Sequence, residues 1–154
     1  MRTVFAAIEQ WPLSVWMRED PYAYFIALIL HAWGMALLAG AGIAISLRGL
    51  GVARAAAIAG FRGFVPLMWL GAGLAGMSGL LLLAAYPAKA LTNPVFAVKF
   101  ASLITAAFLL RALLRPEVTP STPRLLAAIA LVLWLCGVAA GKLLLHTYTV
   151  LTVS

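Results

Sequence analysis

Four long apolar runs, separated by short polar segments, dominate the chain. A bilayer core requires about 20 apolar residues per helix, and each run is long enough. The pattern predicts an all-α bundle of four transmembrane helices, forming one domain over residues 1–154. The predicted spans cover about 22–47, 63–86, 95–114 and 125–150, and the segments between them read RGLGVAR (48–54), YPAKALTNP (86–94) and RPEVTPSTPR (115–124).

The first residues follow a different pattern. Residues 3–17 mix apolar and polar positions and carry Trp11 and Trp16. Tryptophan prefers the membrane–water interface, so we expect a short amphipathic helix lying on the membrane surface. Pro12 keeps any helix there short or begins one. Because no continuous apolar core runs through this segment, it does not resemble a cleaved signal peptide.

Composition supports a membrane protein. The chain is 65% hydrophobic and 10% charged, whereas a soluble domain carries about a quarter charged residues. The net charge of +7 would suggest nucleic acid binding in a soluble protein. Here the arginines flank the apolar runs and form no basic stripe interleaved with aromatics. We therefore expect the lipid bilayer, and no nucleic acid, as a partner.

The basic residues also predict an orientation, because Lys and Arg favour cytoplasmic loops. The first and third loops and their edges are the richest in them, so both termini and the middle loop should be periplasmic in a bacterial inner membrane. The first loop region holds Arg48, Arg54 and Arg62, the third holds Arg111, Arg115 and Arg124, and the middle loop holds Lys89.

Four titratable residues within the predicted spans are candidates for a site: His31, Lys99, Lys142 and His146. Charges there cost about 3 kcal/mol on insertion scales and mark candidate functional residues. The helical rise places them about 14, 8, 12 and 6 Å from the outer ends of their spans. All four fall in the outer half of the membrane. Small residues lie beside them, above all in GAGLAGMSG (71–79).

Each of these residues also has a purely structural interpretation. His31 could bond a neighbouring carbonyl and join two helices. Lys99 and Lys142 could extend to the headgroups, His146 could be hydrated, and the glycines could serve packing alone. The location of all four residues in one leaflet favours a shared site.

Imidazole commonly binds haem iron and copper. We expect haem b, with His31 as axial ligand, Lys99 and Lys142 pairing with the propionates, and His146 as a candidate second ligand. The estimated depths of the two histidines differ by about 8 Å, which counts against that pair. Copper bound by His31 and Met35 is the alternative.

Little in the chain points to catalysis. The acidic residues all lie outside the spans, and there is no Ser/His/Asp set, HExxH motif or Gly-rich phosphate loop. Cys136 is the single cysteine, so it forms no intramolecular disulfide and no cysteine-based metal cluster. We assign no catalytic residue, and whether the protein is an enzyme stays open.

Three segments carry a resemblance: HAWGMALLAGAGIAISLRGLG (31–51), NPVFAVKFASL (93–103) and WLCGVAAGKLLL (134–145). Together they resemble an uncharacterised family of small bacterial four-helix membrane proteins over nearly the whole chain. The family usually has arginine where this chain has Lys142, and His146 lies outside its pattern. More distantly, the chain is similar to HemJ-type protoporphyrinogen oxidases and copper-resistance-D-like membrane domains. The haem-protein likeness implies that His31 is an axial ligand and Lys99 a second essential group.

We therefore predict a small b-type haem protein of the inner membrane that takes part in electron transfer with a quinone or a larger redox partner. One alternative is a copper-binding or copper-transport protein. Another is a non-catalytic assembly subunit, docked within a larger complex or oligomer through the GAGLAGMSG helix.

Overall fold

The computed structural model describes residues 2–53, 55–56, 58–114 and 122–151. Over these residues it is helical and contains no β-strand, which confirms the predicted fold class. The elements are α1 (Arg2–Glu9), α2 (Pro12–Glu19), α3 (Ala23–Leu50), the short 3₁₀ helix η1 (Ile58–Gly63), α4 (Phe64–Ala85), α5 (Pro87–Leu91), α6 (Pro94–Leu113) and α7 (Thr122–Leu151).

Four of these helices, α3, α4, α6 and α7, are long and apolar enough to cross a membrane. The chain is a multi-pass membrane protein. The predicted spans match these helices to within a few residues. The largest shifts are at α3, which continues to Leu50, and at α7, which begins at Thr122. Helix α3 ends where Gly51 takes a φ of 103°, a left-handed conformation that glycine adopts without a steric penalty.

The helix starts follow from local chemistry. Asp20 Oδ1 accepts hydrogen bonds from the backbone N–H groups of Tyr22 and Ala23, both at 2.8 Å. These bonds satisfy amides that have no acceptor within α3. Asn93 does the same for α6 by accepting from Val95 N–H at 2.9 Å. The predicted start of the first span, at about residue 22, lies one residue before Ala23, where α3 begins.

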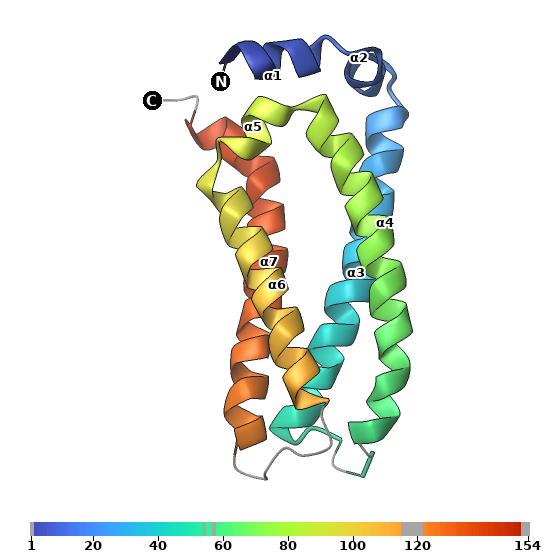
Figure 1. The fold of residues 1–154 in the computed structure, drawn as a ribbon, viewed down its shortest axis with the longest axis vertical. Helices are drawn as coiled ribbons and strands as arrows, with labels where there is room; N and C mark the ends of the chain where they lie inside the picture. The colour runs from blue at the N-terminus through green and yellow to red at the C-terminus, as the bar shows by residue number, and fades with distance from the viewer. Residues whose placement is uncertain (1, 54, 57, 115–121, 152–154) are drawn as a thin grey trace.

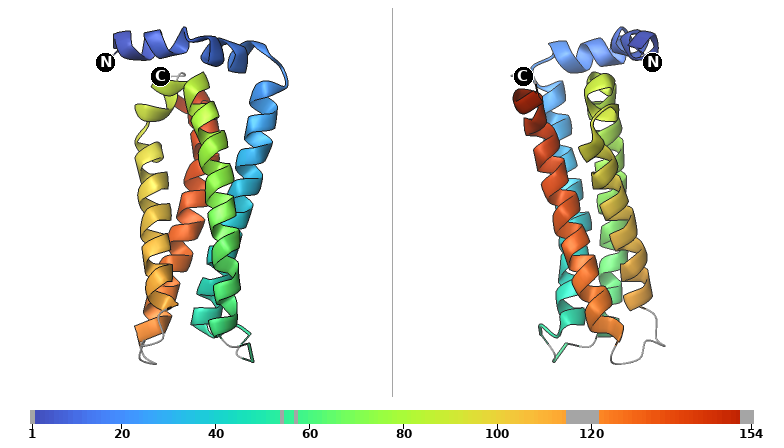
Figure 2. Two further views of the ribbon diagram at one scale, coloured as in Figure 1. Left: turned by 45° about the vertical axis from the view of Figure 1, so that its right-hand side comes forward. Right: turned by 90° about the vertical axis from the view of Figure 1, so that its left-hand side faces the viewer.

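The N-terminal segment forms two short helices, α1 and α2, where one was expected, and they lie across one end of the bundle (Figures 1 and 2). Ser14 Oγ donates to Ala84 O at 2.6 Å, and the Arg18 guanidinium donates to Ala85 O at 3.0 Å. The last carbonyl groups of a helix receive no hydrogen bond from the N–H groups of that helix. Ser14 and Arg18 thus cap the C-terminal end of α4 and attach α2 to the bundle.

The long helices associate through small residues. A Cβ on Gly71 of α4 would lie 2.6 Å from Leu38 N of α3, so the two backbones approach more closely than any side chain allows. Gly34 of α3 contacts the Ala75 backbone of α4 in the same way. Helix α3 also packs on α7, and α7 packs on α6. Helices α4 and α6 make few contacts and face each other across an opening (Figures 1 and 2).

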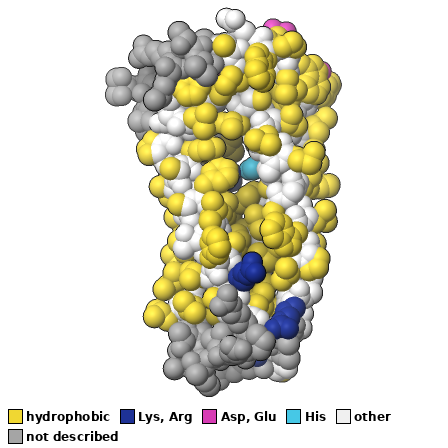
Figure 3. Space-filling view, in the orientation of Figure 1, with side chains coloured by type: hydrophobic (Ala, Val, Ile, Leu, Met, Phe, Trp, Pro, Cys, Tyr) yellow, Lys and Arg dark blue, Asp and Glu magenta, His cyan; other side chains and the backbone are white. Residues whose placement is uncertain are grey.

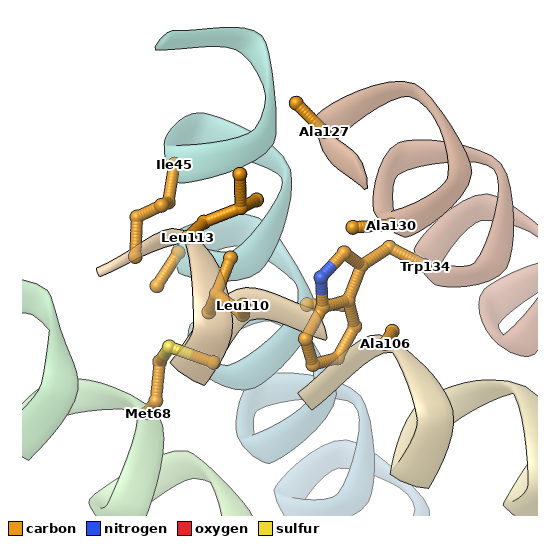
Figure 4. Packing of buried hydrophobic residues seen from close by; sticks show 10 residues of the cluster. Ile45, Met68, Ala106, Leu110, Leu113, Ala127, Ala130 and Trp134 are labelled. Atoms are coloured by element: carbon orange, nitrogen blue, oxygen red, sulfur yellow. The ribbon is translucent and has the colours of Figure 1, made fainter. Parts of the chain in front are cut away.

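A hydrophobic cluster closes the bundle at the end away from α1 and α2. Its largest member, Trp134 of α7, is fully buried and lies directly against Gly42 of α3. Figure 4 shows Met68 of α4 and Leu110 of α6 in the same cluster. All four long helices therefore meet at this end, although α4 and α6 separate along the rest of their length. The labelled members of the cluster are Ile45, Met68, Ala106, Leu110, Leu113, Ala127, Ala130 and Trp134.

Because α3 and α4 pack with their backbones in contact, a larger side chain between them should lower the thermal stability of the protein. In Gly34→Leu the new side chain meets the Ala75 backbone, which cannot move aside, so the variant should unfold at a Tm lower by roughly 3–10 °C. Gly73→Leu is the matched control, because a Cβ there meets nothing within 4 Å. Circular dichroism melts in mild detergent give the comparison. Equal Tm values for the two variants would contradict this packing.

Candidate functional site

The opening between α4 and α6 is a groove of about 1510 Å³. Its walls are mostly apolar side chains, and in Figure 3 it forms a hollow with a histidine at its bottom. Among the residues that the structure describes, no acidic side chain lines it. The basic residues that do line it are His31, Lys89, Lys99, Arg62 and Arg111.

His31 reaches the groove from α3 and is fixed by α4. Its Nδ1 lies 2.9 Å from the backbone oxygen of Ala75. A carbonyl only accepts, so Nδ1 carries the proton and donates, and the Nε2 lone pair points away from α4. A Cβ on Gly79 would lie 3.2 Å from His31 Cε1, so the glycine makes room for the ring. Ser78 Oγ, at 3.4 Å from Nδ1, donates its own hydrogen to Leu74 O at 2.6 Å.

Lys99 approaches the same ring from the opposite wall. Its Nζ lies 3.1 Å from His31 Nε2, and the side chain is only 9% exposed. The amine donates and Nε2 accepts, because lysine has no acceptor when protonated. Gly141 of α7 lies under the lysine, where a Cβ would be 3.5 Å from Lys99 Cε. The structure thus brings together two of the predicted site residues, which we call the His31–Lys99 pair.

Lys142 and His146 do not join this pair. Both are exposed on α7, and neither lines the groove. His146 Nδ1 lies 3.0 Å from Lys142 O of its own helix. The groove-lining residues of α7 are Trp134, Gly141, Leu144 and Leu145, and Lys142 is turned by about 100° around the helix from Gly141. The arrangement expected from depth alone, with Lys142 and His146 beside His31, is not what the structure shows.

Several residues that shape the site were not predicted from the sequence as its components. Ala75 supplies the carbonyl for His31, and Gly79 and Gly141 leave space for the imidazole and the lysine. The only sequence signal was their place in GAGLAGMSG or directly before Lys142. Met35 lines the groove one helical turn from His31. No group of three or more His, Cys, Asp or Glu side chains suited to a metal occurs among the described residues.

The site places one imidazole nitrogen and one amine inside an apolar groove that opens between α4 and α6. Nε2 is the atom that could bind a metal ion, with Nδ1–H oriented by a carbonyl as in many metal-binding histidines. Lys99 Nζ could donate to a carbonyl or carboxylate oxygen of a ligand. The groove suits a hydrophobic molecule that carries a small polar or metal-bearing centre.

The geometry predicts the tautomer of His31. In a His146→Gln variant His31 is the single histidine, and ¹⁵N NMR should show a neutral ring protonated at Nδ1. Replacing Lys99 by Met should shift the Nε2 resonance and leave the tautomer unchanged, because Ala75 O still holds Nδ1–H. A ring protonated at Nε2 would contradict the assignment.

Comparisons with known proteins found no match to this chain among family models, curated proteins or solved structures. The resemblance to the four-helix family, and the more distant one to HemJ-type and copper-resistance-D-like proteins, stays a prediction.

Proposed function

We propose that this chain is a small b-type haem protein that takes part in electron transfer within the bacterial inner membrane. The observation that carries the proposal is His31: its Nδ1–H is held by Ala75 O, and its Nε2 faces a large apolar groove. A haem axial ligand needs a lone pair on one ring nitrogen and an oriented N–H on the other. When bound, haem would supply one-electron chemistry.

The groove fits a porphyrin in size and polarity. Its volume of about 1510 Å³ exceeds the 300–1,000 Å³ typical of small-molecule sites. On α4, Ala72, Gly76 and Gly79 face the groove, and a Cβ at Gly76 would meet nothing within 4 Å. These small residues leave flat space beside His31. The opening between α4 and α6 would admit an apolar ring or a quinone from the bilayer.

Haem binding requires Lys99 to leave Nε2, because the amine and the iron would use the same lone pair. Lysine has a long flexible stem, and Gly141 leaves space beside it. After such a movement the ammonium would be placed to pair with a porphyrin propionate. Lys142 lies outside the groove, so in this proposal Lys99 alone pairs with a haem propionate. His31 is then the single protein ligand that we assign.

Copper binding is the second candidate function, because Met35 and His31 both line the groove. Soft thioether and imidazole ligands suit copper. The size and mostly apolar lining of the groove favour haem. An assembly role through the GAGLAGMSG helix is the third candidate: Gly71, Ala75 and Ser78 pack inside the protein, whereas Gly73, Gly76 and Met77 are exposed.

The visible spectrum of the protein purified in mild detergent tests the proposal. We expect a Soret band with α/β bands on reduction, and a pyridine haemochrome assay giving about one haem per chain. His31→Ala should lower the haem content more than about tenfold. The matched control His146→Ala should keep it, because His146 is exposed outside the groove.

Other results would contradict haem binding. These are full haem content in His31→Ala, or no band after haem is added to the purified protein. A colourless protein with copper that is lost in His31→Ala would support the copper function. A protein with neither cofactor would support the assembly subunit.

We further propose that both termini are periplasmic. Helix α1 and the end of α7 lie at the same end of the bundle (Figure 1). The opposite end carries Arg48, Arg62, Arg111 and Arg124, the kind of residues that favour the cytoplasmic side. Arg54 and Arg115, which entered the same prediction, lie outside the described residues.

The orientation predicts the behaviour of fusions at Ser154. Alkaline phosphatase, which folds only in the periplasm, should be active there, and green fluorescent protein exported through the same pathway should stay dark. The reverse pattern would place the termini in the cytoplasm and overturn the assignment.

A further inference from the structure

The groove is longer than a ring held at His31 requires. Its lining on α6 continues from Lys99 to Arg111, twelve residues further along the helix. That distance is about 18 Å at the α-helical rise. Between these two positions the α6 side of the groove is apolar and includes Leu103, Ala107 and Phe108. We call this part of the cavity, from the His31–Lys99 pair to the arginines, the lower groove.

Two arginines lie where the lower groove ends. Arg111 is on the last turn of α6, and Arg62 lies just before α4. Both are exposed and both line the groove. Arg62 also donates to Leu114 O at 3.0 Å, which joins the two walls at this end. In the part of the chain that the structure describes, no carboxylate lines the groove to balance these charges.

The rims of the lower groove face the bilayer. Trp69 of α4 is 75% exposed and Phe108 of α6 is 68% exposed, although both line the groove. A chain entering from the side would pass between two apolar walls. Half of a hydrocarbon core of roughly 30 Å is about 15 Å, close to the length of the lower groove. The cavity therefore has the length of one lipid chain and a cationic end at headgroup level.

We propose that the lower groove binds one acyl chain of an anionic phospholipid, whose phosphate pairs with Arg111 and Arg62. The lipid comes from the leaflet that adjoins these arginines and enters between α4 and α6. Arginine suits this role because its guanidinium binds phosphate oxygens in a bidentate manner. The site is separate from the His31–Lys99 pair, so lipid binding does not depend on the proposed haem function.

Native mass spectrometry of the purified full chain tests the proposal. The probes are phosphatidylglycerol and phosphatidylcholine with identical acyl chains. Both carry the phosphate, but the choline cation of phosphatidylcholine cancels its net charge and competes with the arginines. We expect one tightly retained phosphatidylglycerol and a preference over phosphatidylcholine of roughly 25-fold, about fivefold for each arginine. Arg62→Gln/Arg111→Gln should abolish this preference. Arg48→Gln, at the same end of the bundle but outside the groove lining, should keep it.

A second pair of variants tests whether the acyl chain of the lipid lies in the lower groove. Ala107→Trp fills the lower groove and should remove bound lipid of either kind. Val132→Trp places the same side chain on an exposed position of α7 that does not line the groove, and should leave lipid binding unchanged. Circular dichroism melts establish whether both variants are folded. If Ala107→Trp is not, Val65→Trp fills the same part of the groove from α4.

Three results would overturn the proposal. They are equal retention of the two lipids by the unmodified chain, undiminished retention in both groove-filling variants, and an isoprenoid quinone found in the lower groove in place of the phospholipid. Failure of the haem proposal would appear only in the visible spectrum and would not alter the lipid preference.

Discussion

The need to satisfy the polar atoms of His31 away from water shapes the site between α4 and α6. Within the hydrocarbon region an unpaired donor or acceptor costs several kcal/mol. His31 meets this constraint at both ring nitrogens, by donating to Ala75 O and accepting from Lys99 Nζ. Because these partners come from α4 and α6, one imidazole connects the two halves of the bundle at the point where the walls otherwise separate. His31 therefore joins, within the groove, two walls that also meet in the Trp134 cluster at the far end of the bundle.

That interaction depends on close backbone approach. His31 can reach the Ala75 carbonyl only because Gly34 and Gly71 let α3 and α4 pack with their backbones in contact. Gly79 and Gly141 then leave room for the ring and for the lysine stem. Lipid provides no hydrophobic drive for helices to associate, so the small residues in GAGLAGMSG determine how close the helices come. Packing thus sets the orientation of His31.

The long spans could be predicted from the sequence because hydropathy depends only on residue type and run length. His31 and Lys99 could also be identified, since ionisable residues are rare in spans. Depth along a helix, however, contains no information about the direction a side chain takes around it. For that reason Lys142 and His146 were grouped with His31 although they point away from the groove. Predicting the contact between His31 and Ala75 O requires knowing that α4 packs on α3. No pattern of residues within α3 indicates which helix is its neighbour.

The attachment of α2 has a consequence for biogenesis. Ser14 and Arg18 bond to Ala84 O and Ala85 O, the carbonyls that close α4. Helix α2 is synthesised before α4, and its docking partner follows some seventy residues later. During translation α1 and α2 must wait on the membrane surface until the second span has inserted. Their amphipathic character thus serves the nascent chain, by keeping the segment at the bilayer while its acceptor is still being made.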